Sequence, residues 1–229
     1  MPEFIDQILH VDKYLQQGIS QFGPMIYAIL WAVVFCETGL IIFPFLPGDS
    51  LLFASGMFSN PALWTDTPGA WHPNILVMCL VYISAAIVGD STNFWIGRNL
   101  GVKLFKEDSK LFKKKHLEAT YEFFEKHGAK AIIIGRFVPI VRTLVPFVAG
   151  LQKISYKRFI FLSITGSLIW VGVCCGAGYL FGAIPWVKEN FEKVILIIVG
   201  LSVLAVAAEG LRNRRHKKQA AKVAEAEQV

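Results

Sequence analysis

The fold of this chain is decided by residues 135–150, which read GRFVPIVRTLVPFVAG. The stretch is apolar enough for a bilayer, yet it holds two arginines, Arg136 and Arg142, and two prolines, Pro139 and Pro146. An arginine at membrane depth costs at least a few kcal/mol, so such a residue faces the protein interior or water. Prolines break helices, and broken backbone at membrane depth is tolerated only where protein or a cavity surrounds it. The stretch therefore predicts a broken, functional segment inside a membrane.

A second apolar stretch, residues 37–50, reads ETGLIIFPFLPGDS and carries the opposite charge through Glu37 and Asp49. The residues expected to break this helix are Pro44, Pro47 and Gly48. Asp49 and Ser50 are residue types that cap helix N-termini, so a short helix is expected over residues 51–58. Two acids in one break and two bases in the other predict that the two stretches act together.

The composition is that of an integral membrane protein. Of the 229 residues, 54% are hydrophobic and only 17% are charged, against about 25% charged in soluble domains. The net charge is +6, and five Lys or Arg residues lie in the short run 212–218. A basic cluster directly after an apolar span is a topology signal, so we expect no nucleic-acid partner. The cysteines and histidines show no metal-type spacing, so we expect no metal and no cofactor.

Hydropathy predicts an all-α helical bundle with amphipathic surface helices. The expected order is an amphipathic N-terminal helix in 1–24, a membrane domain in 25–211, and a basic cytoplasmic tail in 212–229. Within the membrane domain we expect a re-entrant segment in 25–58, a span in 74–97, surface helices in 98–128, a re-entrant segment in 129–152, and spans in 159–182 and 194–211. The repeated order of break, short helix and span suggests an inverted repeat.

The distribution of Lys and Arg favours the same topology. The basic tail after residue 211 and the basic segment 98–128 should both face the cytoplasm. Both flanks of 129–152 then lie inside, so that segment must enter the membrane and return. If 25–58 is also re-entrant, the two hairpins meet from opposite faces.

Glu37, Asp49, Arg136 and Arg142 are the main candidates for a functional site, because ionisable residues within a membrane are expected to be functional. The alternative is a structural ion network in which two acids neutralise two bases. Asp90 is a further candidate, although its neighbourhood could simply be a polar patch at a helix end.

These motifs resemble the bacterial DedA family, which carries the SNARE-associated or VTT domain. The resemblance rests on Glu37-Thr38-Gly39, on residues 43–49 (FPFLPGD), on residues 135–142 (GRFVPIVR) and on residues 146–150 (PFVAG). It covers about residues 5–215 and includes Val88-Gly89-Asp90. The family implies two opposed re-entrant hairpins, a multi-pass protein of the bacterial inner membrane, and important residues at the positions of Glu37, Asp49, Arg136 and Arg142.

The resemblance also implies transport of undecaprenyl phosphate or a phospholipid, coupled to the proton motive force. In the resulting hypothesis Arg136 and Arg142 hold the lipid phosphate, with help from free N–H groups near Thr143 at a helix N-terminus. Protons on Glu37, Asp49 and Asp90 then control its release. The alternative is a proton-coupled antiporter of small ions or drugs. An enzyme such as a lipid phosphatase is disfavoured, because the histidines lie outside the two breaks and no nucleophile motif is present.

Overall fold

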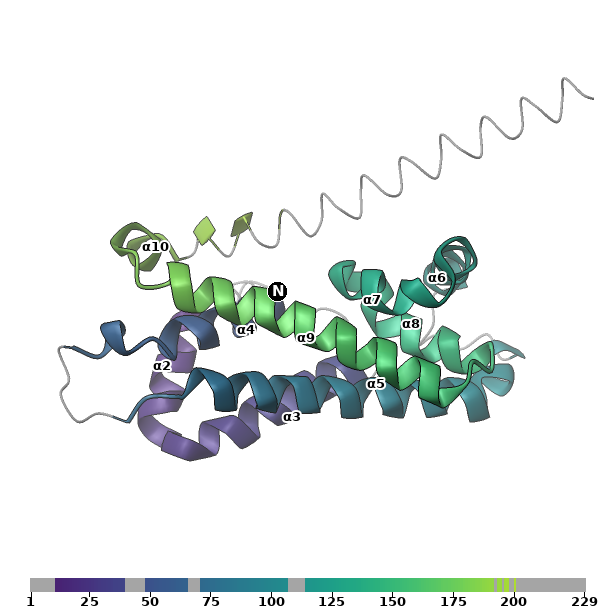
Figure 1. The fold of residues 1–229 in the computed structure, drawn as a ribbon, viewed down its shortest axis with the longest axis horizontal. Helices are drawn as coiled ribbons and strands as arrows, with labels where there is room; N and C mark the ends of the chain where they lie inside the picture. Colours follow the sequence, from purple (N-terminus) through teal and green to yellow (C-terminus); the bar gives the residue numbers. More distant parts are fainter. Residues whose placement is uncertain are drawn as a thin grey trace, which may run out of the picture.

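The computed structural model describes residues 11–39, 48–65, 71–106 and 114–191, together with residues 193, 194, 196, 197 and 200. Every regular element in this part of the chain is a helix, as the predicted all-α class requires (Figure 1). Some predicted features lie outside the described residues. They are the breakers Pro44 and Pro47, the start of the N-terminal helix, most of the predicted span 194–211, and the basic tail 212–229.

Nine α-helices and four short 3-10 helices occupy the described residues. The α-helices are α2 (Val11–Phe22), α3 (Ile26–Gly39), α4 (Gly48–Phe58), α5 (Ile75–Lys106), α6 (Lys114–His127), α7 (Ala131–Ile134), α8 (Pro139–Leu151), α9 (Tyr156–Phe181) and α10 (Pro185–Glu189). The 3-10 helices are η1 (Gly23–Met25), η2 (Pro61–Leu63), η3 (Gly128–Lys130) and η4 (Gly135–Phe137).

Three helical stretches among the described residues are long and apolar enough to cross a membrane: Leu15–Gly39, Ile75–Asn99 and Tyr156–Phe181. The second and third coincide with the predicted spans 74–97 and 159–182. The first joins the second half of α2 to α3, where the sequence predicted a separate surface helix followed by a re-entrant segment. The lengths of these helices therefore agree with the membrane location that the composition predicted.

Helix α2 has the amphipathic pattern expected of the N-terminal segment. Leu15 and Ile19 are buried, whereas Gln16 and Gln17 are exposed. The helix ends where Gly23 takes a left-handed conformation, with φ of 52°, which glycine adopts without the steric penalty of a side chain.

The second predicted break is shorter than expected. Val138 is extended, with φ of −113° and ψ of 106°, and Pro139 follows it in the first turn of α8. Proline is well suited to the first turn of a helix, because its missing N–H has no helical partner there. Pro146, however, lies inside α8 and does not end it. The prediction of a break running from Pro139 to Pro146 was therefore wrong at its second residue.

Two other helix ends also differ from the sequence-based expectation. Helix α4 begins at Gly48, so Asp49 lies in its first turn and does not act as the cap before residue 51. Helix α5 runs on to Lys106, so residues 98–106 continue the spanning helix and do not start a separate surface helix. Residues 98–106 contain no proline and one glycine, Gly101. A single glycine weakens a helix without ending it.

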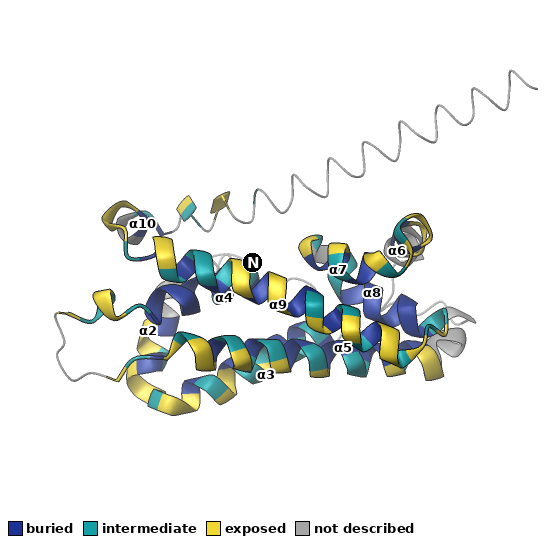
Figure 2. Ribbon diagram, viewed as in Figure 1, coloured by how far each residue is buried: buried dark blue, intermediate teal, exposed yellow. Residues whose placement is uncertain are grey.

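The buried apolar residues form two separate cores. The first core joins α2, α3, α4, the N-terminal half of α5 and the C-terminal half of α9. The second core joins the other halves of α5 and α9 to α6, α7 and α8. Figure 1 accordingly shows α2, α4 and α10 grouped at one end of the molecule and α6, α7 and α8 at the other, with α5 and α9 running through both. In Figure 2 the ribbons of α4 and α8 are coloured mostly as buried.

Glycines bring α4 into backbone contact with α9 in the first core. A Cβ atom on Gly56 would collide with the carbonyl of Cys175, and one on Gly178 would collide with the carbonyl of Phe53. Small residues at such positions permit the close approach on which helix packing in membranes depends.

The same reciprocal contact joins α5 to α8 in the second core. A Cβ atom on Gly97 would collide with the carbonyl of Phe147, and one on Gly150 would collide with the carbonyl of Phe94. The short helices α4 and α8 therefore dock on long helices in the same way. In both, the contact uses a Phe-x-x-Gly segment, which is the weak internal similarity visible in the sequence.

Candidate functional site

The charged residues lie where the two cores meet. On α5, Asp90 falls between Ala86 of the first core and Phe94 of the second. On α9, Ser163 falls between Phe159 of the second core and Trp170 of the first. Asp90 is 2% exposed and Ser163 is fully buried, so this polar layer lies within protein. Buried polar groups require hydrogen-bond partners, and the partners divide the site into two clusters.

The Arg142 cluster consists of Glu37, Asp49, Arg142 and Trp170, from α3, α4, α8 and α9. The guanidinium of Arg142 forks between the two acids. Its Nη2 donates to Glu37 Oε1, and its Nη1 donates to Asp49 Oδ1 at 2.8 Å. The Glu37 side chain is 1% exposed, that of Arg142 is 12% exposed and that of Asp49 is 26% exposed. Asp49 is therefore the acid of this cluster that reaches toward the surroundings.

Trp170 completes this cluster from α9. Its indole Nε1 donates to Asp49 Oδ1 at 2.9 Å. Its ring also lies 5.4 Å from the guanidinium carbon of Arg142, within the range of a cation–π interaction. One aromatic residue thus contacts both the acid and the base.

Gly48, the residue before Asp49, has a steric role in this cluster. A Cβ atom at residue 48 would collide with the carboxylate of Glu37. The absence of a side chain therefore lets the start of α4 lie against that carboxylate. Gly48 was predicted to be a helix breaker. The structure places it as the first residue of α4, with a steric role beside Glu37.

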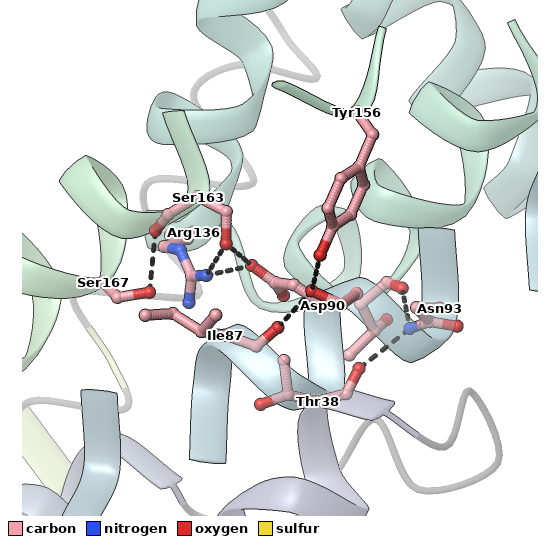
Figure 3. Close-up of polar contacts among 10 residues, drawn as sticks. Thr38, Ile87, Asp90, Asn93, Arg136, Tyr156, Ser163 and Ser167 are labelled. Carbon is pink, nitrogen blue, oxygen red and sulfur yellow. Dashed lines mark hydrogen bonds and ion pairs between the residues drawn. The ribbon is translucent and has the colours of Figure 1, made fainter. Parts of the chain in front are cut away.

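The Arg136 cluster consists of Asp90, Arg136 and Ser163, from α5, η4 and α9 (Figure 3). Arg136 Nη2 donates to Asp90 Oδ2 and to Ser163 Oγ, the latter at 3.2 Å. Ser163 Oγ in turn donates to Asp90 Oδ2 at 2.6 Å. All three side chains are at most 7% exposed. This cluster is a closed, buried triangle, in contrast to the partly open Arg142 cluster.

Asn93 links α3 to α8 through their backbones. Its Nδ2 donates to the carbonyl of Thr38 at 2.8 Å and to the carbonyl of Thr143 at 3.0 Å (Figure 3). Thr38 follows Glu37 in the chain, and Thr143 follows Arg142. The amide of Asn93, which is fully buried, therefore fixes the spacing of the segments that carry the Glu37–Arg142 ion pair.

The structure rearranges the predicted site residues. Arg142 lies with Glu37 and Asp49, as the complementary charges suggested, but Arg136 pairs with Asp90. Thr143 is buried one turn inside α8, whose N-terminus lies at Val138 and Pro139. Thr143 therefore presents no helix N-terminus to a ligand, and the expectation of free N–H groups there was wrong.

Sequence reasoning missed Ser163, Trp170 and Asn93. Asn93 ends the polar run 90–93, Ser163 is followed at helical spacing by Ser167, and Trp170 stands in an apolar run. The available signal was a hydrogen-bonding side chain within a span, since such a group requires a partner in a membrane. Among the described residues, no group of three His, Cys, Asp or Glu side chains is placed to hold a metal ion.

Comparisons with known proteins show which family this chain resembles in sequence. The VTT domain matches residues 46–180. Protein DedA of Escherichia coli K12 is 45% identical over 219 residues, which cover 95% of this chain and 97% of that protein. An uncharacterized membrane protein of Mycobacterium tuberculosis H37Rv is 38% identical over 221 residues, with 96% and 92% covered. Inner membrane protein YghB of Escherichia coli K12 is 32% identical over 184 residues, 80% of each chain. No solved structure matches this chain.

Proposed function

This chain belongs to the DedA family of membrane proteins that carry the VTT domain, and we propose that it is a transporter that moves a lipid phosphate across the membrane with the help of protons. It is a multi-pass protein of the bacterial inner membrane. The proposed substrate is undecaprenyl phosphate or a phospholipid, and the proposed partners are membrane lipids and protons.

The observation that carries the proposal is the fork of Arg142 between Glu37 and Asp49. A guanidinium holds carboxylates and phosphates through the same parallel N–H donors. Two acids share the one guanidinium, so a proton on either acid leaves the other to balance the charge of Arg142. Protonation of one acid would release an N–H donor of Arg142. A lipid phosphate can then take the vacated position while its apolar chain stays in the bilayer.

Asp49 is the acid proposed to exchange with the phosphate, because it is the more exposed of the two. Glu37 stays on the other side of the guanidinium and keeps Arg142 in place. When Asp49 loses its proton it competes for Arg142 and displaces the phosphate. Proton and lipid binding are thereby linked, and such linkage is reciprocal.

Arg136 has a different part in this proposal from the one predicted from sequence. Its guanidinium is occupied by Asp90 and Ser163 in a closed triangle. We assign it to the second proton-linked contact, which holds η4 to α5 and α9 until Asp90 is protonated. Arg136 then becomes free to join Arg142 on the phosphate.

The two hairpins, residues 25–58 and 129–152, are proposed to enter the membrane from opposite faces as an inverted repeat. The matched glycine contacts of α4 with α9 and of α8 with α5 support this arrangement. The polar layer between the two cores would then lie near the membrane midplane, where transporters of this type bind their substrates.

The test is reconstitution in liposomes with a defined lipid phosphate and an imposed pH gradient. We expect movement of the lipid phosphate that is faster with the gradient than without it, and that Asp49→Asn abolishes this acceleration. Movement at the same rate without the gradient, unchanged by Asp49→Asn, would refute the coupling. Cation-dependent proton flux in liposomes that lack the lipid phosphate would favour the antiporter. Release of inorganic phosphate would favour an enzyme.

A further inference from the structure

Trp170 is placed unlike the exposed tryptophans of the chain. Trp95, Trp71 and Trp186 are between 38% and 56% exposed, as suits residues near a membrane interface. Trp170 is 4% exposed and lies in the middle part of α9. A phenylalanine would supply much of the same apolar bulk without a polar atom that requires a partner. The N–H group is therefore the feature of Trp170 that needs an explanation.

The indole N–H shares its acceptor with Arg142. Trp170 Nε1 lies 2.9 Å from Asp49 Oδ1, and Arg142 Nη1 lies 2.8 Å from the same oxygen. The two donors come from α9 and α8 and converge on one point in space. An anionic oxygen is the group that best satisfies two converging N–H donors, since hydrogen bonds to a charged acceptor are roughly twice as strong as neutral ones.

Asp49 is the most exposed of the charged residues in this arrangement. Its side chain is 26% exposed, against 12% for Arg142. The ring of Trp170 faces the guanidinium at 5.4 Å, and Glu37 holds the other Nη atom of Arg142. The donor pair therefore keeps its geometry through contacts that do not involve Asp49.

The geometry points to Trp170 and Arg142 as a two-donor subsite for one phosphate oxygen of the substrate, with the carboxylate of Asp49 occupying that oxygen's position in this conformation. This inference rests on the proposed function and adds a substrate-binding residue to it. The substrate class is a phosphate ester of a long-chain lipid. No bond is made or broken, because phosphate and carboxylate exchange as hydrogen-bond acceptors.

The experiment measures equilibrium binding of radiolabelled farnesyl phosphate to the purified full-length protein in a neutral detergent. Farnesol, which lacks the phosphate, serves as the non-competing control ligand. Wild-type protein should bind the probe, and Trp170→Phe should bind it at least tenfold more weakly, as expected for the loss of a hydrogen bond to a charged group. Trp186→Phe is the matched control, because Trp186 is 56% exposed on α10, and it should bind as the wild type does.

The outcomes separate this inference from the proposed function. Wild-type protein that fails to bind the probe would overturn both. Probe binding that is lost in Arg142→Ala but unchanged in Trp170→Phe would overturn the subsite alone. If Trp170→Phe does not give monodisperse protein, Asp49→Ala decides. Removing the competing carboxylate should strengthen probe binding several-fold, whereas equal or weaker binding would overturn the subsite.

Discussion

The Arg142 cluster and the Arg136 cluster are built from the same chemical groups but differ in how they are closed. Each joins an arginine from residues 135–151 to one or two acids on other helices. In the Arg136 cluster the only acid is as deeply buried as its partner, and Ser163 closes the triangle. In the Arg142 cluster a second acid, Asp49, is 26% exposed. A closed ion pair suits a contact that holds until its acid is protonated, whereas an open one suits a contact whose acid exchanges directly with a ligand.

The largest expected effect is on the closed cluster. Arg136→Ala leaves Asp90 buried without its counter-charge, which should cost about 3–5 kcal/mol of folding free energy. The measurement is reversible unfolding in mixed detergent. The double variant Asp90→Leu/Arg136→Met is the control, because replacing a buried pair by apolar groups is often neutral or stabilising. It should regain stability without regaining lipid transport. Full stability in Arg136→Ala would show that the closed cluster does not hold the fold.

The open cluster should respond in transport more than in stability. Arg142→Lys keeps the charge but replaces the planar fork by a single ammonium group. Losing one charge-assisted hydrogen bond should slow transport in liposomes by about tenfold to a hundredfold. Arg158→Lys, at an exposed position of α9, should transport at the wild-type rate. Equal rates in the two variants would mean that the fork on Arg142 has no role in transport.

A smaller change to the open cluster is steric. Gly48→Ala places a methyl group against the carboxylate of Glu37, so either that carboxylate, which Arg142 holds, or the start of α4 must shift. We expect a loss of about 1–3 kcal/mol of stability, as for other overpacked positions, together with slower transport. Gly172→Ala is the matched control, because open space surrounds that position on α9. If the two alanine variants unfold alike, close packing of Gly48 on Glu37 is not required.

The smallest expected effect concerns Ser163, which closes the Arg136 cluster. Ser163→Ala removes a hydroxyl that donates to Asp90 at 2.6 Å and accepts from Arg136, so it should cost about 1–2 kcal/mol. Ser167→Ala, one turn further along α9, removes a hydroxyl that donates to the carbonyl of Ser163 in the same helix. It should cost less than Ser163→Ala in the same unfolding assay. The reverse order would argue against the triangle.

The sequence predicted the spans, which depend on local composition, but it did not fully predict which charged side chains pair across helices. Hydropathy located the spans that correspond to α5 and α9, because each is a long apolar run. The N-terminal helix predicted in 1–24 corresponds to α2, which ends just before Gly23. The pairing of charges was only half predicted, because Arg136 and Arg142 lie on opposite sides of the extended residue Val138. A change of backbone direction at that point sends the two side chains to different helices, and no sequence spacing encodes it.

Pro146 and Trp170 illustrate the remaining limits. Proline usually ends a helix, yet α8 continues through Pro146, and its packing against α5 outweighs the one missing backbone bond. Trp170 stands in an apolar run and reads as an ordinary core residue. Its role appears only when α4 brings Asp49 to its indole nitrogen.

The pairing of Glu37 with Arg142 also bears on how the protein enters the membrane. The two residues are 105 positions apart in the chain, so α3 is synthesised well before α8. During that interval Glu37 has no arginine beside it, and an ionised carboxylate in hydrocarbon costs a few kcal/mol. We therefore expect α3 to be inserted with Glu37 in its neutral form. Arrival of α8 would then supply the counter-charge, so that the ion pair forms only after α4 and α5 have been made.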